Sequence, residues 1–213
     1  MLIKVDTKQT IINPAELMKA LNNAWLSLYG ETPKKSSIAL LASQTGCETG
    51  WTHCYNHNLG NCKAPKDDPN QTIYYMALKG VWEIINGRKV MIPADQPGAW
   101  FRAFNSLQEG ANFHLDFLHS KYHSCWQAVL DGSTVAFATH LSNSHYFTAP
   151  VGQYISLMNS FYSKLINVDL TPDAPTPTIT FENNDIDFNL GLNIGIDDDQ
   201  QADAGIDPND AQS

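Results

Sequence analysis

The stretch ALLASQTGCETGWTHCYNHNLGNCKA, residues 39–64, combines features that neither a core helix nor an ordinary loop requires. Its first half is small and apolar and ends in a single acid, Glu48. Ile38 lies ten positions before Glu48 and Leu41 seven, so a helix that continues to Glu48 places the carboxylate on its apolar face. We therefore expect a helix from about Ser36 that carries a partly buried carboxylate at its end.

The chemistry of such a carboxylate follows from its burial. Desolvation disfavours the charged form and raises the pKa of Glu48. A general acid for the cleavage of a glycosidic bond needs this protonated state near neutral pH. A glutamate that is satisfied by backbone amides or by an arginine fits the same geometry, so the helix alone leaves both interpretations open.

The second half of the stretch has the residue types of a sugar-binding cleft. Trp51 and Tyr55 offer flat faces on which pyranose rings can stack, and the amides of Asn56, Asn58 and Asn61 can bond hydroxyl and acetamido groups. Each of these residue types is common in loops when taken singly. Together, beside one acid, they favour carbohydrate binding.

The rest of the first 169 residues predicts a mainly helical α+β fold with a small β-hairpin lobe. Asn13-Pro14-Ala15-Glu16 is typical of a helix start, and Gly30 of its end. Asn86-Gly87 is the strongest hairpin signal, and Val81–Ile85 is the strand before it. Further helices are expected at roughly 106–119, 122–130, 134–143 and 151–166.

Composition divides the 213-residue chain into a body, residues 1–169, and a tail, residues 170–213. The tail holds ten Asp or Glu and no Lys or Arg, which leaves 13 basic and 12 acidic side chains in the body, a net charge of +1. The nearly neutral body lacks the basic face of a nucleic-acid-binding protein. A hydrophobic content of 43% suits one globular domain plus an appendage.

The tail begins with the Pro-rich linker TPDAPTPT, residues 171–178, and ends in an acidic segment with the composition of a disordered chain. Thr178–Phe181 and Ile186–Ile196 show short apolar alternation and could each add as a strand to the sheet edge of a partner. A solvated tail is the simpler alternative. A protein partner or larger assembly that holds the tail is therefore one expectation.

Apolar runs in the chain are much shorter than the about 18 residues of a membrane span, so no membrane-spanning segment is expected. The start, MLIKVDTKQTIINP, lacks the apolar core of a secretory signal peptide. We therefore expect no Sec-type leader here. A chain of this kind would leave the cell by a non-Sec route or within a larger particle.

The cysteines allow more than one interpretation. Cys54 and Cys62 could close a small loop in an oxidising compartment, while free buried thiols are the alternative. Together with Cys47, His53 and His57 they lack the regular pair spacing of a zinc site, so neither a metal nor another cofactor is expected. Cys47 at the end of a helix is also a poor nucleophile, because the helix dipole opposes the thiolate there.

Several short motifs follow one another between residues 38 and 165. They are ETGW (48–51), NLGNCK (58–63), VWEIING (81–87), FRAF (101–104), SLQE (106–109) and YFTA (146–149). In this order they resemble bacterial peptidoglycan-cleaving N-acetylglucosaminidases, glycoside hydrolase family 73 of the lysozyme-like superfamily. The resemblance implies a lysozyme-like helical domain that cleaves β-1,4 bonds of the glycan strand.

By this resemblance Glu48 is the general acid, and Glu83 on the hairpin is the second carboxylate, which activates water or stabilises the transition state. Tyr146 holds the acetamido group or the water. A surface glutamate and a buried aromatic are the respective alternatives for Glu83 and Tyr146. The implied substrate-binding residues are Trp51, Tyr55, Asn58, Asn61, Trp82 and Tyr154. The cysteine and histidine cluster is a departure from the family pattern.

Two classes of function stay open at this point. The first is an endo-N-acetylglucosaminidase with bacteriolytic activity, with a muramidase or lytic transglycosylase of the same fold as the runner-up. The second is a non-catalytic glycan-binding or assembly protein docked through its acidic tail. A hydrolase carried in a phage virion for cell-wall penetration combines them. Its expected place of action is the cell wall or periplasm.

Overall fold

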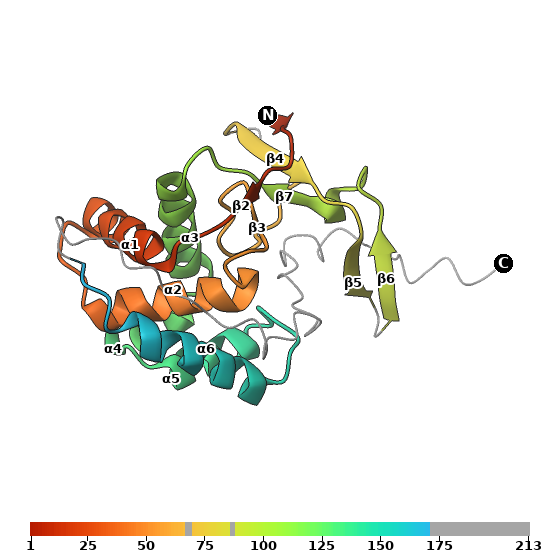
Figure 1. Ribbon diagram of the computed structural model, residues 1–213. Coiled ribbons are helices and arrows are strands. Elements are labelled where there is room, and N and C mark those ends of the chain that lie inside the picture. The colour runs from red at the N-terminus through yellow and green to blue at the C-terminus, as the bar shows by residue number, and fades with distance from the viewer. Residues whose placement is uncertain (67–69, 86–87, 171–213) are drawn as a thin grey trace.

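The computed structural model describes residues 1–66, 70–85 and 88–170. This part of the chain is a mixed α+β structure in which helices dominate, which confirms the expected fold class (Figure 1). The helices are α1 (Pro14–Tyr29), α2 (Lys35–Thr49), α3 (Leu107–Lys121), α4 (Trp126–Asp131), α5 (Thr134–Asn143) and α6 (Val151–Leu165), with 3-10 turns η1 (Pro97–Ala99) and η2 (His123–Cys125). The strands are β1 (Leu2–Lys4), β2 (Gln9–Thr10), β3 (Cys54–Tyr55), β4 (Ile73–Ala77), β5 (Val81–Ile85), β6 (Arg88–Ile92) and β7 (Trp100–Arg102).

Helix α1 begins and ends where its sequence predicts. The Asn13 side chain accepts hydrogen bonds from the backbone N–H groups of Ala15 and Glu16, and Pro14 occupies the first turn. Gly30 ends the helix in the left-handed region at φ 72°, and its N–H donates to the carbonyl of Leu26. The helix packs mainly on α3, with which it forms one side of the body.

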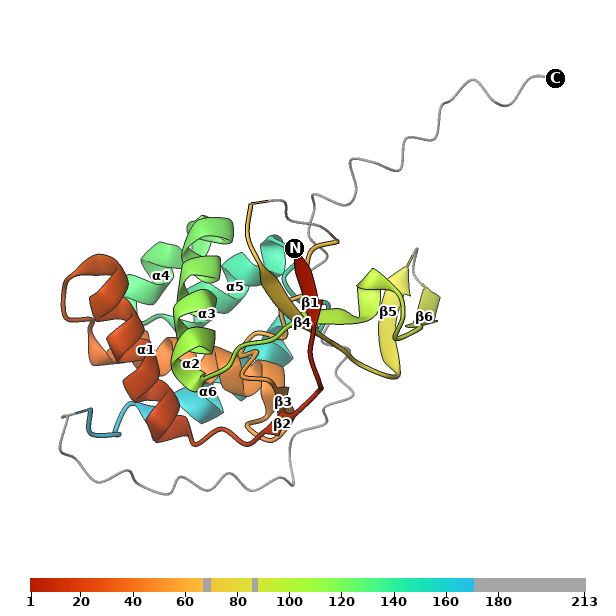
Figure 2. The ribbon, with the colours of Figure 1, turned by 90° about the horizontal axis from the view of Figure 1, so that it is seen from above.

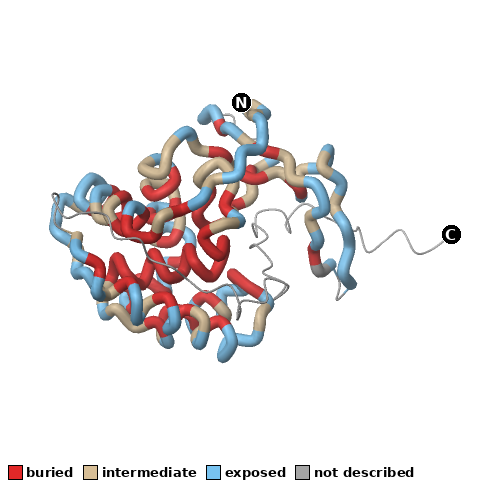
Figure 3. The backbone as a smooth tube through the Cα atoms, viewed as in Figure 1, coloured by how far each residue is buried: buried red, intermediate tan, exposed pale blue. Residues whose placement is uncertain are grey.

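Helix α2 is the centre of the structure. Every residue from Ser37 to Thr49 is buried, and α6 and α1 pack against it (Figure 3). Small residues such as Ala39, Ala42 and Gly46 let these neighbours approach closely. A helix that is surrounded in this way keeps even its polar side chains in the interior, so the position of Glu48 follows from the packing of α2.

Strands form three small sheets in the described residues: β1-β4-β7, β2-β3 and β5-β6. The N-terminal strands β1 and β2 were not predicted, because segments of three and two residues are too short to show a period. Strand β1 pairs in parallel with β4, Leu2 opposite Ile73, and β2 pairs with β3, Thr10 opposite Cys54. The N-terminal segment thereby fixes the loop that follows α2.

The β5–β6 hairpin forms the predicted lobe. Trp82 lies opposite Met91 and Glu83 opposite Val90 in an antiparallel register. Figures 1 and 2 both place the hairpin at the end of the molecule away from α1, on the side toward which α2 ends. The expected Asn86-Gly87 turn lies outside the described residues.

The linker and acidic tail, residues 171–213, also lie outside the described residues, so their expected strands stay predictions. None of the helices in the described part of the chain is long and apolar enough to cross a membrane.

Gly110→Ala is expected to destabilise the protein by about 1–3 kcal/mol, since overpacking forces the surroundings to shift. A Cβ on Gly110 of α3 would lie 2.2 Å from the carbonyl oxygen of His57, in the loop that follows α2. Gly152 in α6 is the matched control, because a Cβ there meets nothing within 4 Å. Gly152→Ala should stabilise by about 0.5–1 kcal/mol. Urea unfolding measures both, and equal effects would contradict the close packing of α3 on the loop.

Candidate active site

Glu48 lies in the last turn of α2, just before Gly50 ends the helix at φ 52°. Its side chain is buried, with 5% of the residue exposed. Desolvation raises the pKa of Glu48 to about 8, although hydrogen bonds from Tyr154 and Gln44 lower it in part. The carboxyl group is therefore protonated at neutral pH, which is the state that a general acid needs.

Two side chains donate hydrogen bonds to the same oxygen of Glu48. The Tyr154 hydroxyl donates to Oε1 at 2.8 Å, and the Gln44 amide Nε2 donates to Oε1 at 3.3 Å. The proton of the acid then belongs on Oε2. Tyr154 is held flat against Phe147, with ring centroids 3.9 Å apart and planes 5° apart. Tyr154 was expected to bind substrate, but this geometry makes it a partner of the acid.

Gln44 was not predicted, and it connects the acid to Tyr146. Its Nε2 also donates to the Tyr146 hydroxyl at 2.9 Å, and that hydroxyl donates to the carbonyl of Gly60 at 3.4 Å. Burial is the first cause that raises the pKa values of Tyr146 and Tyr154 well above their usual range, so both stay phenols that can donate. The signal in the sequence is the spacing: Gln44 lies one helical turn before Glu48, on the same face.

The loop after α2 is strained around this network. Trp51, Asn56, His57 and Asn61 all have positive φ, between 46° and 66°, although none of them is glycine. Such conformations cost free energy and gather at functional sites. The Asn61 side chain donates to the backbone carbonyl of Glu48 at 2.7 Å. Asn61, expected to bind sugar, thus holds the end of α2 to its own loop.

Trp51 and Asn58 correct the expectation of a sugar-binding surface. The Trp51 ring is buried and meets Phe161 edge-on, with centroids 5.3 Å apart. Asn58 is 1% exposed, and its amide bonds the backbone N–H and carbonyl of Cys62 and the carbonyl of Arg102. Both residues build the core and the loop, because their polar or flat faces are already occupied by the protein.

The other expected substrate-binding aromatics keep accessible surface. Tyr55 is half-buried in β3, opposite Gln9. Trp82 is 51% exposed on β5, and the Lys89 ammonium lies 5.1 Å from its ring centroid. Trp82 is thus the most exposed of the expected sugar-stacking residues.

Glu83 is not the surface glutamate of the alternative interpretation. It is buried and pairs with Lys63, whose Nζ lies 2.7 Å from Glu83 Oε1. Burial lowers the pKa of Lys63, and the hydrogen bond and charge of Glu83 raise it in part. The second expected carboxylate therefore lies in a sheltered ion pair on the hairpin.

Of the two alternatives for Cys54 and Cys62, the structure shows buried thiols and no bridge between them. None of the four cysteines forms a disulfide, all are buried, and the Cys54 thiol donates to the carbonyl of Asn58 at 3.6 Å. Desolvation raises the pKa of Cys54 to about 12, so it behaves as a small apolar core residue. Among the described residues no three metal-ligating side chains gather into a site.

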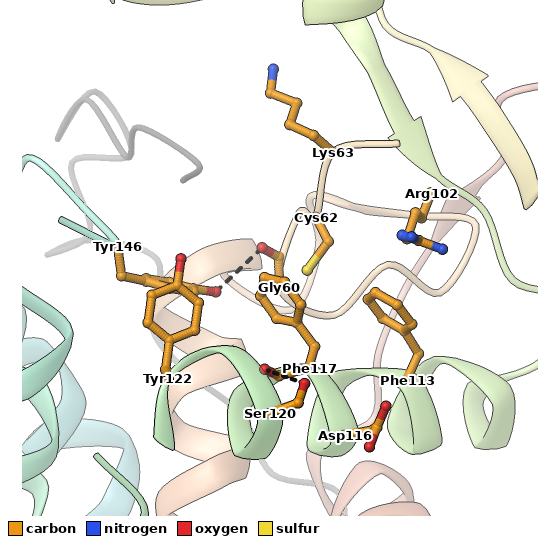
Figure 4. A pocket seen from close by; sticks show the side chains of 10 residues that line it. All are labelled: Gly60, Cys62, Lys63, Arg102, Phe113, Asp116, Phe117, Ser120, Tyr122 and Tyr146. Atoms are coloured by element: carbon orange, nitrogen blue, oxygen red, sulfur yellow. Dashed lines mark hydrogen bonds between the residues drawn. The ribbon is translucent and has the colours of Figure 1, made fainter. Parts of the chain in front are cut away.

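A cavity of about 150 Å³ lies beside the network (Figure 4). Gly60, Tyr122 and Tyr146 border it, and so do the α3 side chains Phe117 and Ser120. The rings of Tyr122 and Tyr146 meet edge-on with centroids 5.0 Å apart. The cavity is thus a half-open, aromatic-lined space beside Tyr146, and it is large enough for a small polar substituent.

Comparisons of the chain with protein-family models, curated proteins and solved structures found no match.

Tyr154→Phe is expected to raise the pKa of Glu48 further, by about one unit, because the lost hydrogen bond favoured the charged form. An NMR titration of the Glu48 carboxyl carbon measures this directly. Tyr162→Phe on the same helix is the control, since Tyr162 is only partly buried and is not bonded to Glu48. A Glu48 pKa that falls in Tyr154→Phe would contradict the assigned donor.

Proposed function

We propose that this protein is a lysozyme-like glycoside hydrolase that cleaves β-1,4 bonds in the glycan strand of peptidoglycan, with the specificity of an endo-N-acetylglucosaminidase. The observation that carries the proposal is Glu48, buried at the end of α2 with its Oε1 bonded by Tyr154 and Gln44. Keeping a carboxylic acid in this buried position costs stability at neutral pH. Such an acid can supply the proton that the leaving glycosidic oxygen needs.

Glu48 is the acid in this proposal. It transfers the proton on Oε2 to the leaving oxygen, and Tyr154 and Gln44 stabilise the carboxylate that results through their bonds to Oε1. Tyr146, next to the cavity, orients the acetamido group or the water. Trp82 supplies an exposed ring for stacking on the sugar.

Hydrolysis is favoured over transglycosylation by Glu83. A lytic transglycosylase needs no second carboxylate, because a hydroxyl of the sugar itself attacks. Glu83 is sheltered and paired with the Lys63 ammonium, which supports a role for this second carboxylate in activating water. We place the action of the enzyme in the cell wall or periplasm, with delivery by a phage virion.

Mass spectrometry of the soluble products from purified peptidoglycan tests the proposal, with the wild type beside Glu48→Gln. Reducing-end GlcNAc that is absent with the variant is the expected result. Reducing-end MurNAc would instead identify a muramidase, and anhydro-MurNAc a lytic transglycosylase. No products from a folded wild-type protein would overturn the enzyme and favour a glycan-binding protein.

A further inference from the structure

Lys63 has more contacts than a surface lysine needs. Its Nζ donates to Glu83 Oε1 at 2.7 Å and also to the carbonyl of Gly98, and it lies 4.1 Å from the ring centroid of Phe101. The exposed fractions of the Lys63 and Glu83 side chains are 13% and 10%. In Figure 4 the side chain of Lys63 extends away from the other cavity residues. Lys63 lines the cavity, while its ammonium contacts the hairpin, the Gly98 carbonyl and the Phe101 ring.

The backbone around Lys63 is fixed to a different sheet. Lys63 forms an antiparallel bridge with Phe101 in β7. On either side, Arg102 N–H donates to the carbonyl of Cys62 and Ala64 N–H donates to the carbonyl of Trp100, both at 3.0 Å. One residue thus joins the loop after α2, strand β7 and strand β5.

The hairpin depends on such contacts for its position. Strands β5 and β6 pair only with each other in the described sheets, and an isolated two-stranded hairpin is marginally stable in water. Besides the ion pair, Ile92 lies close to Gly98, where a Cβ would approach its Cγ2 to 3.1 Å. The Lys63 ammonium reaches both the hairpin and the carbonyl of Gly98, so it sets the distance between them.

Lys63 is also the charge partner of Glu83. Glu83 Oε2 is buried and has no hydrogen-bond partner among the described residues. A buried carboxylate without a paired cation is costly to keep in the fold. The hairpin cations Arg88 and Lys89 are exposed, and Lys89 lies over Trp82. Lys63 is thus the cation in direct contact with Glu83 in the described part of the chain.

We propose that Lys63 is a positioning residue that holds Glu83 Oε1, and with it the β5–β6 hairpin, in the place that the general base needs. This inference rests on the proposed function. The water oxygen bonds to the anomeric carbon as its proton passes to the Glu83 carboxylate, the glycosidic C–O bond breaks, and the proton of Glu48 passes to the leaving oxygen. Lys63 touches neither the sugar nor the water, and it acts through Glu83.

Lys63→Met tests the clamp with the full-length protein on purified peptidoglycan. We expect kcat to fall about 10- to 100-fold with little change in KM, since the contribution of a general base is of this size or larger. Lys63→Arg keeps the cation and should restore most of kcat. Lys79→Met, which removes an exposed lysine just before β5, should leave kcat unchanged.

The double variant Lys63→Met/Glu83→Gln separates positioning from folding. It removes both charges, so it should be more stable than Lys63→Met and no slower than Glu83→Gln alone. Wild-type kcat in Lys63→Met, or additive rate losses in the double variant, would overturn the clamp and leave the hydrolase intact. A folded wild type that releases no products would overturn both proposals.

Discussion

Glu48→Gln is expected to lower glycan cleavage by about 10²–10⁴-fold, the usual contribution of a general acid, with the fold intact. Glutamine keeps the shape of the side chain and an oxygen that can accept from Tyr154, but it carries no transferable proton. In the wild type the rate should fall as the pH rises through about 8, where Glu48 loses its proton. Release of soluble fragments from peptidoglycan at pH 6 to 9.5 measures both effects.

The same substitution should make the protein more stable. The pKa of Glu48 is raised from 4.5 to about 8 on folding, so its stabilising contribution is complete below pH 4.5 and is lost as the pH rises through 8. At pH 7 this linkage costs the wild type about 3 kcal/mol relative to a side chain that does not titrate. A gain in stability with a loss of rate is typical of a residue kept for function.

Glu16→Gln on α1 is the matched control, because Glu16 is exposed on the surface. It should change neither the rate nor the slope of stability with pH. Cleavage that persists in Glu48→Gln at the rate of the Glu16→Gln protein would remove Glu48 from the mechanism.

The local patterns of the sequence were enough to predict the long elements of this fold. The cap at Asn13, the helical spacing before Glu48 and the strand Val81–Ile85 each depend on neighbours within a few residues. The inward position of Glu48 follows from the same spacing. The short strands that hold the loop to the N-terminus depend on pairing between residues far apart in the sequence, such as Leu2 with Ile73. Such pairing leaves no local periodicity in the sequence from which it could be predicted.

The assignment of polar residues failed where the partner is distant in sequence. The Asn58 amide has the chemistry to bond a sugar, but it donates a hydrogen bond to the carbonyl of Arg102 within the fold. Conversely, Lys63 seemed part of a loop motif, and only its contact with Glu83 across the lobe gives it a role. Residue type limits which bonds a side chain can make, and tertiary packing decides which of them it makes.

In acid, His114 lowers the free energy of unfolding of the protein by about 3 kcal/mol, and His114→Leu is expected to remove this loss. His114 on α3 is 1% exposed, and both of its ring nitrogens are buried without a hydrogen-bond partner. Burial lowers its pKa from 6.5 to about 4. The unfolded chain therefore takes up this proton first, so stability is complete above pH 6.5 and is lost as the pH falls through 4. At pH 7 leucine should be neutral or stabilising, because it leaves no orphaned nitrogen.

The wild type conceals this effect, because Glu48 opposes it. Between pH 4.5 and 6.5 the stability from His114 rises with pH while that from Glu48 falls, each by about 1.4 kcal/mol per unit. Glu48→Gln is therefore the background in which urea unfolding across this range should show the slope of His114 alone. Adding His114→Leu should flatten the slope, whereas adding His140→Leu, at an exposed site on α5, should not. A slope that persists in the Glu48→Gln/His114→Leu protein would mean that a group other than His114 carries it.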